Sequence, residues 1–220
     1  MTEYQIGVDE AGKGPVLGPM IAAAVRIDDE ADLPDGVADS KQLTAAKRES
    51  LAAELRDVAA VDTAVGVITT DEIDAPETDM NGLTVIAQVR ALTGVASDGD
   101  RALVDAGDVS ESRFGRRVQE AVAERGVDID VTAEHGADDD SRLVGAASII
   151  AKIERDRRIT AIDEEYDTAV GSGYPSDPTT RQFLADYVDH HGELPACTRT
   201  SWATCEDVLA AAEQSELAEF

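Results

Sequence analysis

The sequence predicts an α/β fold in which helices flank a mixed sheet of five strands. Apolar segments typical of strands follow one another early in the chain, and farther along strand-like and helix-like segments alternate. That order is typical of an α/β layer fold with a mixed sheet. The chain has 220 residues, of which 43% are hydrophobic. It can therefore bury one sizeable core, and we expect one compact domain.

The first half of the chain supplies three predicted strands and two predicted helices. Two apolar segments with strand character are joined by a Gly/Pro turn, and a valine-rich segment follows later. Between and after them, apolar residues recur at helical spacing. These patterns predict strands at 4–8, 20–27 and 58–68, a helix that starts near Thr44, and a helix over about 81–92.

The second half alternates strands with helices. A short buried strand is followed by a helix with a serine at its N-cap, and an alternating apolar segment precedes a long helix. An aspartate before a proline then marks another helix start, since proline suits the first turn. The predicted strands are 101–105 and 127–131, and the helices start after Ser110, run over 142–166, and start at Asp177 and near Thr204.

The chain is strongly acidic. It has 46 acidic and 19 basic residues, a net charge of −27, whereas proteins that bind nucleic acids normally carry a basic footprint. Either the partner is not a nucleic acid, or the acidic residues serve solvation in a cell interior at molar salt. At such salt the Debye length is about 3 Å, which largely removes the repulsion between an acidic surface and a nucleic acid. Dispersed acids, cations near the motifs described below and scarce lysine favour the second interpretation and resemble proteins of extreme halophiles.

The sequence carries no sign of a membrane span or an export signal. No apolar run approaches the roughly 20 residues of a membrane helix, and the N-terminus lacks a basic region followed by an apolar core. We therefore expect a cytoplasmic protein. Cys197 and Cys205 are too few for a disulfide framework, and nothing indicates a zinc site.

Four carboxylates stand where a predicted strand ends or a predicted helix begins. Asp9 and Glu10 end the first strand, Asp105 ends a later one, and Asp138 precedes the long helix. Polar groups converge at such places in layered folds. Two divalent ions about 3.5–4 Å apart activate water and stabilise a leaving oxygen, and Mg²⁺ prefers oxygen ligands. The alternative is a solvated surface role, and for Asp138 an acidic loop at a helix N-terminus.

The residues around these carboxylates resemble the motifs of the ribonuclease HII family, in the family's order from about residue 4 to 204. The first motif is the run from Gly7 to Pro15, in which Gly12-Lys13-Gly14 follows the paired acids. The others are Asp39-Ser40-Lys41, Ala102 to Ala106, and Asp138 with Ala146 to Lys152; Gly171 to Pro178 and Arg199-Thr200-Ser201-Trp202 resemble the archaeal branch.

This resemblance implies the ribonuclease H-like fold with a helical C-terminal extension. We expect a catalytic core at 1–165, a helical substrate-binding extension at 166–211 within the same compact unit, and a mobile tail at 212–220. The implied enzyme is a monomer that hydrolyses the RNA strand of RNA–DNA hybrids. It also cuts 5′ to ribonucleotides embedded in duplex DNA and leaves a 3′-hydroxyl and a 5′-phosphate. The implied metal ligands for two Mg²⁺ or Mn²⁺ ions are Asp9, Glu10, Asp105 and Asp138.

The resemblance also implies the substrate contacts. Main-chain groups of Gly12, Lys13 and Gly14 would meet the ribose 2′-hydroxyl, with Lys13 near a phosphate, and Tyr174 would pack on the ribose. Many relatives carry arginine where Lys13 stands; lysine keeps the positive charge but cannot donate two parallel hydrogen bonds as a guanidinium does. An ordinary tight turn and a packed tyrosine are the alternatives. Three further cations are candidate phosphate contacts or ion-pair partners of surplus acids: Lys41, Lys152 and Arg199.

The C-terminal residues resemble the peptide motif that binds the sliding clamp. Gln214, Leu217 and Phe220 follow one another at three-residue steps, and one helical turn presents such anchors together to a groove. A frayed amphipathic tail is the alternative.

Two other functions remain open from the sequence. One is another two-metal nuclease of the ribonuclease H-like fold that cuts DNA or branched substrates. The other is a non-catalytic acidic protein that binds cations; it accounts for the charge but not for carboxylates at strand ends beside glycines.

Overall fold

The computed structural model describes residues 5–37, 43–77 and 79–218 and divides into two compact units. The sheet unit comprises the chain up to Ala11, then Met20–Ile68 and Asp79–Arg155. The helical unit comprises Gly12–Pro19, Thr69–Thr78 and the chain from Asp156 onward. The boundary thus falls within the long helix, ahead of the division expected at 165, and two loop segments join the helical unit.

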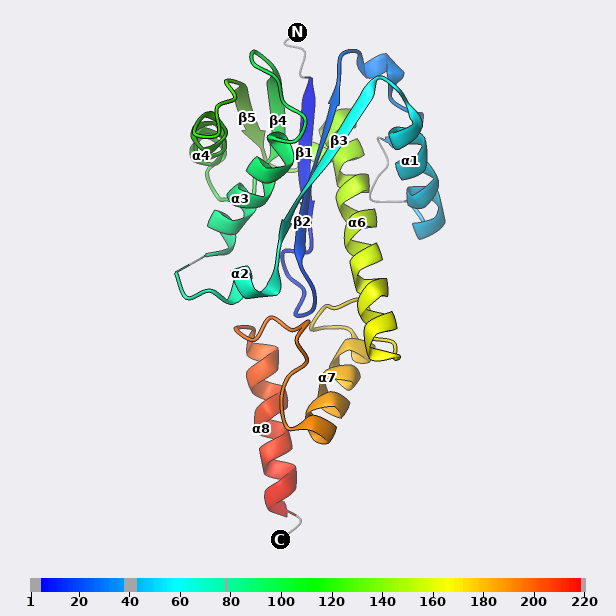
Figure 1. The fold of residues 1–220 in the computed structure, drawn as a ribbon, viewed down its shortest axis with the longest axis vertical. Helices are drawn as coiled ribbons and strands as arrows, with labels where there is room; N and C mark the ends of the chain where they lie inside the picture. Colours follow the sequence, from blue (N-terminus) through cyan, green and yellow to red (C-terminus); the bar gives the residue numbers. More distant parts are fainter. Residues whose placement is uncertain (1–4, 38–42, 78, 219–220) are drawn as a thin grey trace. The chain divides into compact units, whose positions relative to one another are not determined.

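The sheet unit is built on five strands in the order β3-β2-β1-β4-β5 (Figure 1). β1 pairs antiparallel with β2, and β2 with β3, whereas the β1–β4 and β4–β5 pairs are parallel. The mixed five-stranded sheet predicted from the sequence is therefore confirmed. The strands are β1 (Ile6–Ala11), β2 (Met20–Ile27), β3 (Val61–Ile68), β4 (Arg101–Asp105) and β5 (Asp130–Glu134).

Three of these strands differ from the sequence prediction: β1 runs over Ile6–Ala11 instead of 4–8, and β3 and β5 start later than predicted. β3 starts at Val61 because Val58 instead closes the preceding helix, where its N–H donates to the Glu54 carbonyl. β5 starts at Asp130, although the apolar alternation extends back to Val127. The parallel register pairs Val8 of β1 with Val104 of β4. The C-terminal ends of β1 and β4, which carry three of the predicted carboxylates, therefore meet at the same edge of the sheet.

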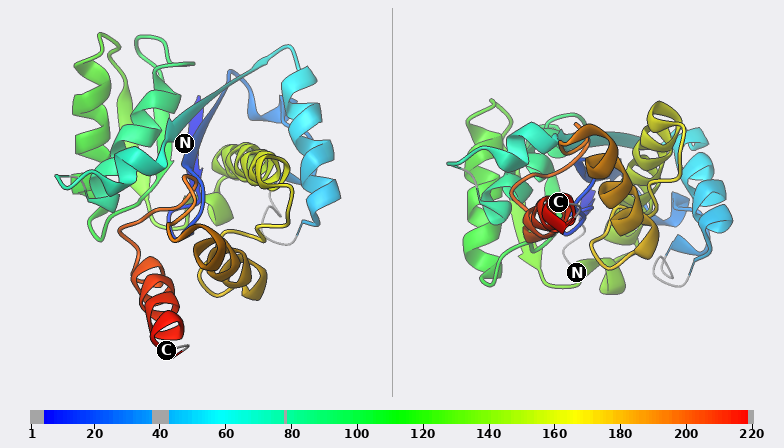
Figure 2. Two further views of the ribbon diagram at one scale, coloured as in Figure 1. Left: turned by 60° about the horizontal axis from the view of Figure 1, so that its bottom comes forward. Right: turned by 90° about the horizontal axis from the view of Figure 1, so that it is seen from below.

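Helices cover both faces of this sheet (Figures 1 and 2). On one face, α1 (Ala45–Asp57) and the first part of α6 (Arg142–Tyr166) pack against β2 through a buried aliphatic core. On the other face lie α3 (Met80–Leu92) and α4 (Glu111–Ala123), which contact β1 to β3 and β5 respectively. The side chains of Thr44, Asp79 and Ser110 cap α1, α3 and α4 by accepting backbone N–H bonds.

Three short helices lie outside the sequence predictions. They are η1 (Glu30–Asp32), α2 (Thr70–Asp74) and α5 (Ala137–Asp140). Each is five residues or fewer, which is too short for a 3.6-residue periodicity to show. α5 matters for the site because Asp138 lies within it, where the sequence indicates only an acidic segment before a helix.

The helical unit packs the end of α6 with α7 (Pro178–His191) and α8 (Ala203–Ala218) around its own apolar core. Asp177 caps α7 and Pro178 occupies its first turn, as predicted. α8 continues to Ala218, past residue 212, where the sequence analysis places the start of a mobile tail. The helix formers Ala211, Ala212 and Glu213 carry the helix past that point. Among the helices that the structure describes, none combines the length and apolar composition needed to cross a membrane.

Replacing Gly7 by alanine is expected to destabilise the sheet unit. A Cβ atom at this position would overlap the backbone of Leu143 and Val144 at the start of α6, and overpacking of this kind costs about 1–3 kcal/mol. Denaturant unfolding in high KCl measures the effect. Gly82→Ala is the matched control, because its nearest atom would be 3.5 Å away and alanine gains about 0.5–1 kcal/mol over glycine inside a helix. Equal stability of Gly7→Ala and the unchanged chain would contradict this packing.

Candidate functional site

β1 sends its two acidic side chains to opposite faces of the sheet. Side chains alternate along a strand, so Asp9 shares a face with Gly7, which lies against α6. Glu10 points to the other face, where its Oε2 accepts a 2.8 Å hydrogen bond from Gln88 Nε2 of α3. The two adjacent carboxylates are thus held by different helices.

Asp9 is buried, with 6% of its surface exposed, and it meets α6 through Ser148. The Ser148 hydroxyl hydrogen-bonds to the Asp9 carboxylate. Lys152, one helical turn later, places its Nζ 2.7 Å from Ser148 Oγ. A lysine, a buried serine and a buried aspartate therefore form a continuous chain of polar contacts, which links Lys152 to the carboxylate.

Asp105 and Asp138 lie on the same side of the sheet as Asp9. The β1–β4 register places Asp105 one residue beyond the Val8–Val104 pair, beside Asp9. Asp105 Oδ1 accepts a 2.9 Å hydrogen bond from the Ala137 N–H, which ties the end of β4 to the start of α5. Asp138, the next residue, is itself buried, with 7% of its surface exposed. The folded chain therefore brings together three acidic residues that are far apart in sequence.

The electrostatics of this cluster favour a bound cation. Burial, followed by the negative charges of Asp105 and Asp138, raises the pKa of Asp9 to about 7, although the Ser148 hydrogen bond acts in the opposite direction. Like charges that share a buried site disfavour ionisation. A divalent cation removes that penalty, and carboxylate oxygens are the ligands that such hard ions prefer.

The side-chain positions of these carboxylates do not by themselves define a metal site. Within residues 5–37, 43–77 and 79–218, no three His, Cys, Asp or Glu side chains are grouped closely enough to hold a metal ion. Glu10 in particular faces α3. The residue types, their burial and their mutual repulsion nevertheless fit a divalent metal.

Gln88 is a site residue that the sequence analysis missed. It is fully buried on α3, and its Nε2 donates to Glu10 Oε2 and, at 2.9 Å, to the carbonyl oxygen of Asp105. Its Oε1 is buried and has no hydrogen-bond partner among the described residues. Gln88 thus holds the ends of β1 and β4 in one geometry. The available signal was a lone amide on the apolar face of a predicted helix, near Leu83 and Ala87.

In the helical unit, the Gly12-Lys13-Gly14 turn lies beside Tyr174. Gly12 has a φ of 88°, which favours glycine. A Cβ atom on Gly14 would lie 3.8 Å from the Tyr174 ring. The ring itself is 41% exposed, more than packing in the core would leave. Two predicted substrate-binding segments that are 160 residues apart are therefore neighbours.

Arg199 does not occupy the place expected of a phosphate contact. Its side chain is fully buried, and the guanidinium donates to the carbonyl oxygens of Gly12, Lys13 and Gly18. A guanidinium group that is buried and hydrogen-bonded to main-chain carbonyls is not placed for direct contact with a substrate phosphate. We correct the role of Arg199 accordingly: it contacts the turn.

The remaining predicted site residues fall at the limits of the described structure. Lys41 and Phe220 lie outside the described residues. Leu217 belongs to α8, but described side chains end at Gln214, which is exposed.

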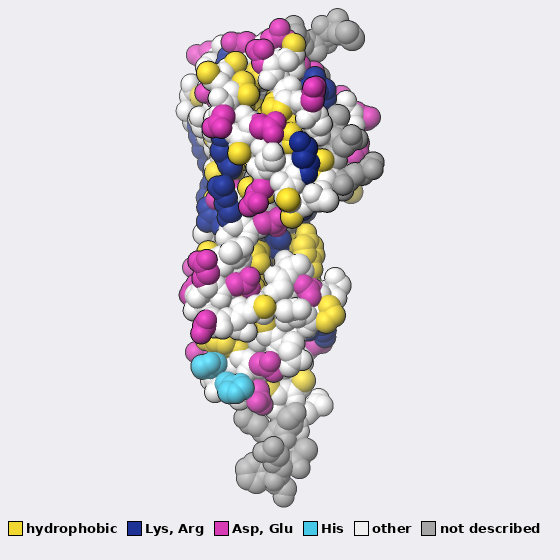
Figure 3. All heavy atoms as spheres, turned by 90° about the vertical axis from the view of Figure 1, so that its right-hand side faces the viewer, with side chains coloured by type: hydrophobic (Ala, Val, Ile, Leu, Met, Phe, Trp, Pro, Cys, Tyr) yellow, Lys and Arg dark blue, Asp and Glu magenta, His cyan; other side chains and the backbone are white. Residues whose placement is uncertain are grey.

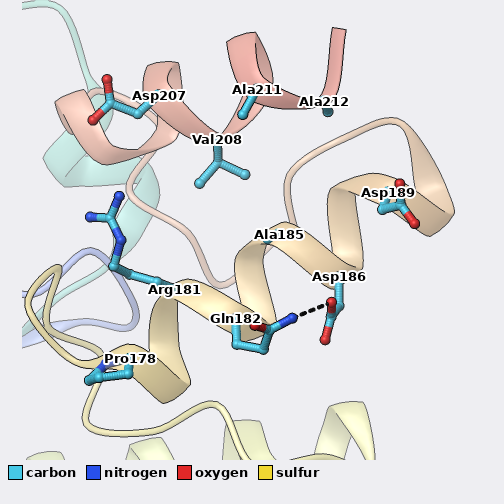
Figure 4. A pocket seen from close by; sticks show the side chains of 10 residues that line it. All are labelled: Pro178, Arg181, Gln182, Ala185, Asp186, Asp189, Asp207, Val208, Ala211 and Ala212. Carbon is cyan, nitrogen blue, oxygen red and sulfur yellow. Dashed lines mark hydrogen bonds between the residues drawn. The ribbon is translucent and has the colours of Figure 1, made fainter. Parts of the chain in front are cut away.

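A pocket of about 610 Å³ lies between α7 and α8 of the helical unit (Figure 4). Its lining includes Arg181, Val208 and the carboxylates of Asp186, Asp189 and Asp207, and none of the predicted site residues. Figure 3 shows that acidic side chains are spread over the face it displays. The acidic surface is therefore not concentrated in one cation-binding patch on that face.

Comparison with known proteins yields one family. The model of the ribonuclease HII family matches residues 6–205. Ribonuclease HII of the halophilic archaeon Haloarcula marismortui is 61% identical over 98% of this chain and 100% of its own length. The crystal structure of ribonuclease H2 from Pyrococcus horikoshii superimposes with a TM-score of 0.86 at 38% identity, over 95% of this chain and 98% of that one. The structure of the PCNA:RNase HII complex from Archaeoglobus fulgidus gives a TM-score of 0.81 at 36% identity, over 92% and 95%.

Replacing Gln88 by methionine is expected to weaken divalent-metal binding about 10-fold, since residues that orient metal ligands typically contribute that much. Methionine keeps the volume of the side chain and removes both amide donors from Glu10 and Asp105. Isothermal titration with Mn²⁺ measures the affinity. Gln119→Met is the matched control, because Gln119 bonds only to the Val131 N–H at the β5 edge in the described hydrogen-bond network. Equal affinities for the two variants would contradict the role given to Gln88.

Proposed function

The chain belongs to the ribonuclease HII family, an α/β enzyme family of the ribonuclease H-like fold, and from that premise we propose how its own residues perform the reaction. The protein is a metal-dependent endoribonuclease that cleaves RNA in RNA–DNA hybrids. We infer that Asp9, Glu10, Asp105 and Asp138 are its catalytic carboxylates. The observation that carries the proposal is the buried convergence of Asp9 with Asp105 and Asp138, which raises the pKa of Asp9.

In the proposed centre these four carboxylates would hold two Mg²⁺ or Mn²⁺ ions, with Asp9 between the charges of Asp105 and Asp138. Two such ions would supply an activated water and a stabilised leaving oxygen. Ser148 and Gln88 orient Asp9 and Glu10 from the two faces of the sheet. Lys152, at hydrogen-bond distance from Ser148, is placed to offer its positive charge to a substrate phosphate beside the carboxylates.

The substrate class follows from the glycine turn and the exposed tyrosine. Main-chain groups of Gly12, Lys13 and Gly14 contact the ribose 2′-hydroxyl, and the Tyr174 ring packs on the sugar, in the proposed complex. Recognition of the 2′-hydroxyl is how a protein distinguishes RNA from DNA. The enzyme then cuts on the 5′ side of a ribonucleotide in duplex DNA and leaves a 3′-hydroxyl and a 5′-phosphate. Lys41 remains a proposed phosphate contact.

The acidic composition fits a cell interior at molar salt. The net charge is −27, and a relative from a halophilic archaeon is 61% identical. We propose that the enzyme acts as a monomer in the cytoplasm, where high salt screens the repulsion between the acidic surface and the substrate. The acidic cation-binding alternative loses its support, because the chain belongs to an enzyme family.

Replacing Asp9 or Asp105 by asparagine is expected to reduce cleavage of a DNA duplex with one ribonucleotide by at least about 100-fold, the scale on which single catalytic groups act. Gel analysis of the products in high KCl with Mg²⁺ or Mn²⁺ measures the rate. Asp139→Asn is the matched control, since this exposed neighbour of Asp138 should retain turnover. Full turnover in both Asp9→Asn and Asp105→Asn would refute the assignment. Cleavage of an all-DNA duplex by the unchanged chain would instead favour another nuclease of the same fold.

We further propose that the C-terminal residues bind a sliding clamp. Two observations support this: Gln214, Leu217 and Phe220 have the spacing of a clamp-binding peptide, and a relative at 36% identity has been solved as a PCNA complex. α8 reaches Ala218, so Gln214 and Leu217 belong to one helical turn, as docking into a groove requires.

Deleting residues 214–220 is expected to abolish capture of the protein on immobilised archaeal PCNA, because both apolar anchors are removed. The double substitution Leu217→Ala with Phe220→Ala should have the same effect, whereas Glu216→Gln should bind normally. Circular dichroism of each variant checks that α8 is retained up to the change. Undiminished capture of the deletion variant would exclude this segment as the clamp ligand.

A further inference from the structure

Arg199 is the largest fully buried side chain among the described residues. Burying a charged group is unfavourable unless hydrogen bonds replace the lost water. Here the guanidinium donates to three main-chain carbonyl oxygens, those of Gly12 at 2.6 Å, Lys13 at 3.1 Å and Gly18 at 2.9 Å. An apolar side chain would fill this space without the cost of burying a charge. The three acceptors of Arg199 all belong to the segment from Gly12 to Gly18, which contains the glycine turn.

These contacts fix the direction of the main-chain donors of the turn. A peptide group is planar, and its carbonyl and N–H point in opposite directions. The carbonyl of Gly12 shares a plane with the N–H of Lys13, and the carbonyl of Lys13 shares one with the N–H of Gly14. Because Arg199 draws both carbonyls toward the interior, both N–H groups are aimed away from it.

The same region fixes the turn relative to Tyr174. The carbonyl of Gly173 accepts hydrogen bonds from the N–H groups of Val16 and Leu17, at 2.7 and 3.2 Å, and Arg199 N–H donates to the Val16 carbonyl at 2.8 Å. Trp202 adds a bond from its indole Nε1 to the Gly14 carbonyl, at 3.2 Å. The loop before Tyr174, the glycine turn and Arg199 therefore form one hydrogen-bonded assembly inside the helical unit.

The guanidinium of Arg199 can bond to all three carbonyl oxygens at once, which a lysine side chain cannot do. Its three nitrogens reach three carbonyls in different directions, whereas a lysine ammonium is a point charge at the end of a flexible chain. The guanidinium also lies 5.2 Å from the centre of the Trp202 ring, within the range of a cation–π contact. The three hydrogen bonds and the contact with the Trp202 ring together restrict the orientation of the Arg199 guanidinium.

We propose that Arg199 is a positioning residue for ribose selection: it aims the Lys13 and Gly14 N–H groups at the 2′-hydroxyl and holds them beside Tyr174. It touches no substrate and acts through the turn. This inference rests on the proposed function, in which the turn and Tyr174 read the ribose. It departs from the direct phosphate contact that the sequence indicates for Arg199.

The test compares the affinities of two duplexes that differ only in one nucleotide, ribo or deoxy. Fluorescence anisotropy in high KCl with EDTA measures both dissociation constants without cleavage. The unchanged chain should bind the ribonucleotide duplex more tightly. Arg199→Lys should lower this preference by about 10-fold, or abolish it where it is smaller, as expected when the hydrogen bonds that place a polar contact are lost.

Arg142→Lys is the matched control. Arg142 also donates to three carbonyl oxygens, those of Glu30, Leu33 and Pro34 at 3.1–3.4 Å, but these acceptors belong to the sheet unit, whereas the turn belongs to the helical unit. This variant should keep the full ribose preference. The pair therefore separates the loss of a carbonyl-binding arginine in general from the loss of this particular one.

Each outcome decides the inference. An unchanged preference in Arg199→Lys, or equal weakening of both duplexes, overturns it while the proposed function stands. Absence of preference in the unchanged chain overturns the ribose-reading role of the turn itself, and the inference with it. If Arg199→Lys fails to fold, Arg199→Gln replaces it, since a neutral amide costs less to bury and cannot reach three carbonyl oxygens at once. That variant should also lower the preference, and an unchanged value overturns the inference.

Discussion

The candidate metal centre depends on the close approach of β1 to the start of α6. Gly7 permits this approach, because any side chain there would overlap the backbone of Leu143 and Val144. Two residues later on the same face, Asp9 is thereby pressed against Ser148 and placed beside Asp105. Packing of the apolar core sets this distance, so the core supports three carboxylates in a repulsive arrangement that a divalent cation relieves.

Asp9 and Glu10 are adjacent in the sequence but have different surroundings, because successive side chains of a strand point to opposite faces of the sheet. Asp9 meets a hydroxyl from α6, and Glu10 meets the amide of Gln88 from α3. The first is buried among like charges, and the second is held by a neutral donor that also fixes the end of β4. One dipeptide thus presents two carboxylates in different surroundings, one on each face of the sheet.

The sequence predicts the long elements well and the short ones poorly. Apolar periodicity locates β2, α6 and the strand that ends at Asp105, since each has enough residues for a pattern. It gives no sign of α5, whose four residues carry Asp138, because helices of that length are fixed by their neighbours. The surroundings of Arg199 likewise cannot be read from the sequence. A cation near a motif suggests a phosphate contact, whereas in the structure the Arg199 side chain is buried and bonded to three main-chain carbonyl oxygens.

By itself, the sequence determined the fold class and the family and singled out four candidate carboxylates, because strand ends, glycines and motif order are local features. The tertiary structure alone decided which side chains contact those carboxylates and which groups support the Gly12-Lys13-Gly14 turn. Gln88, Ser148 and Arg199 each act on residues 78 or more positions away. Contacts over such separations arise only when helices pack on the sheet or loops meet, and no local pattern encodes them.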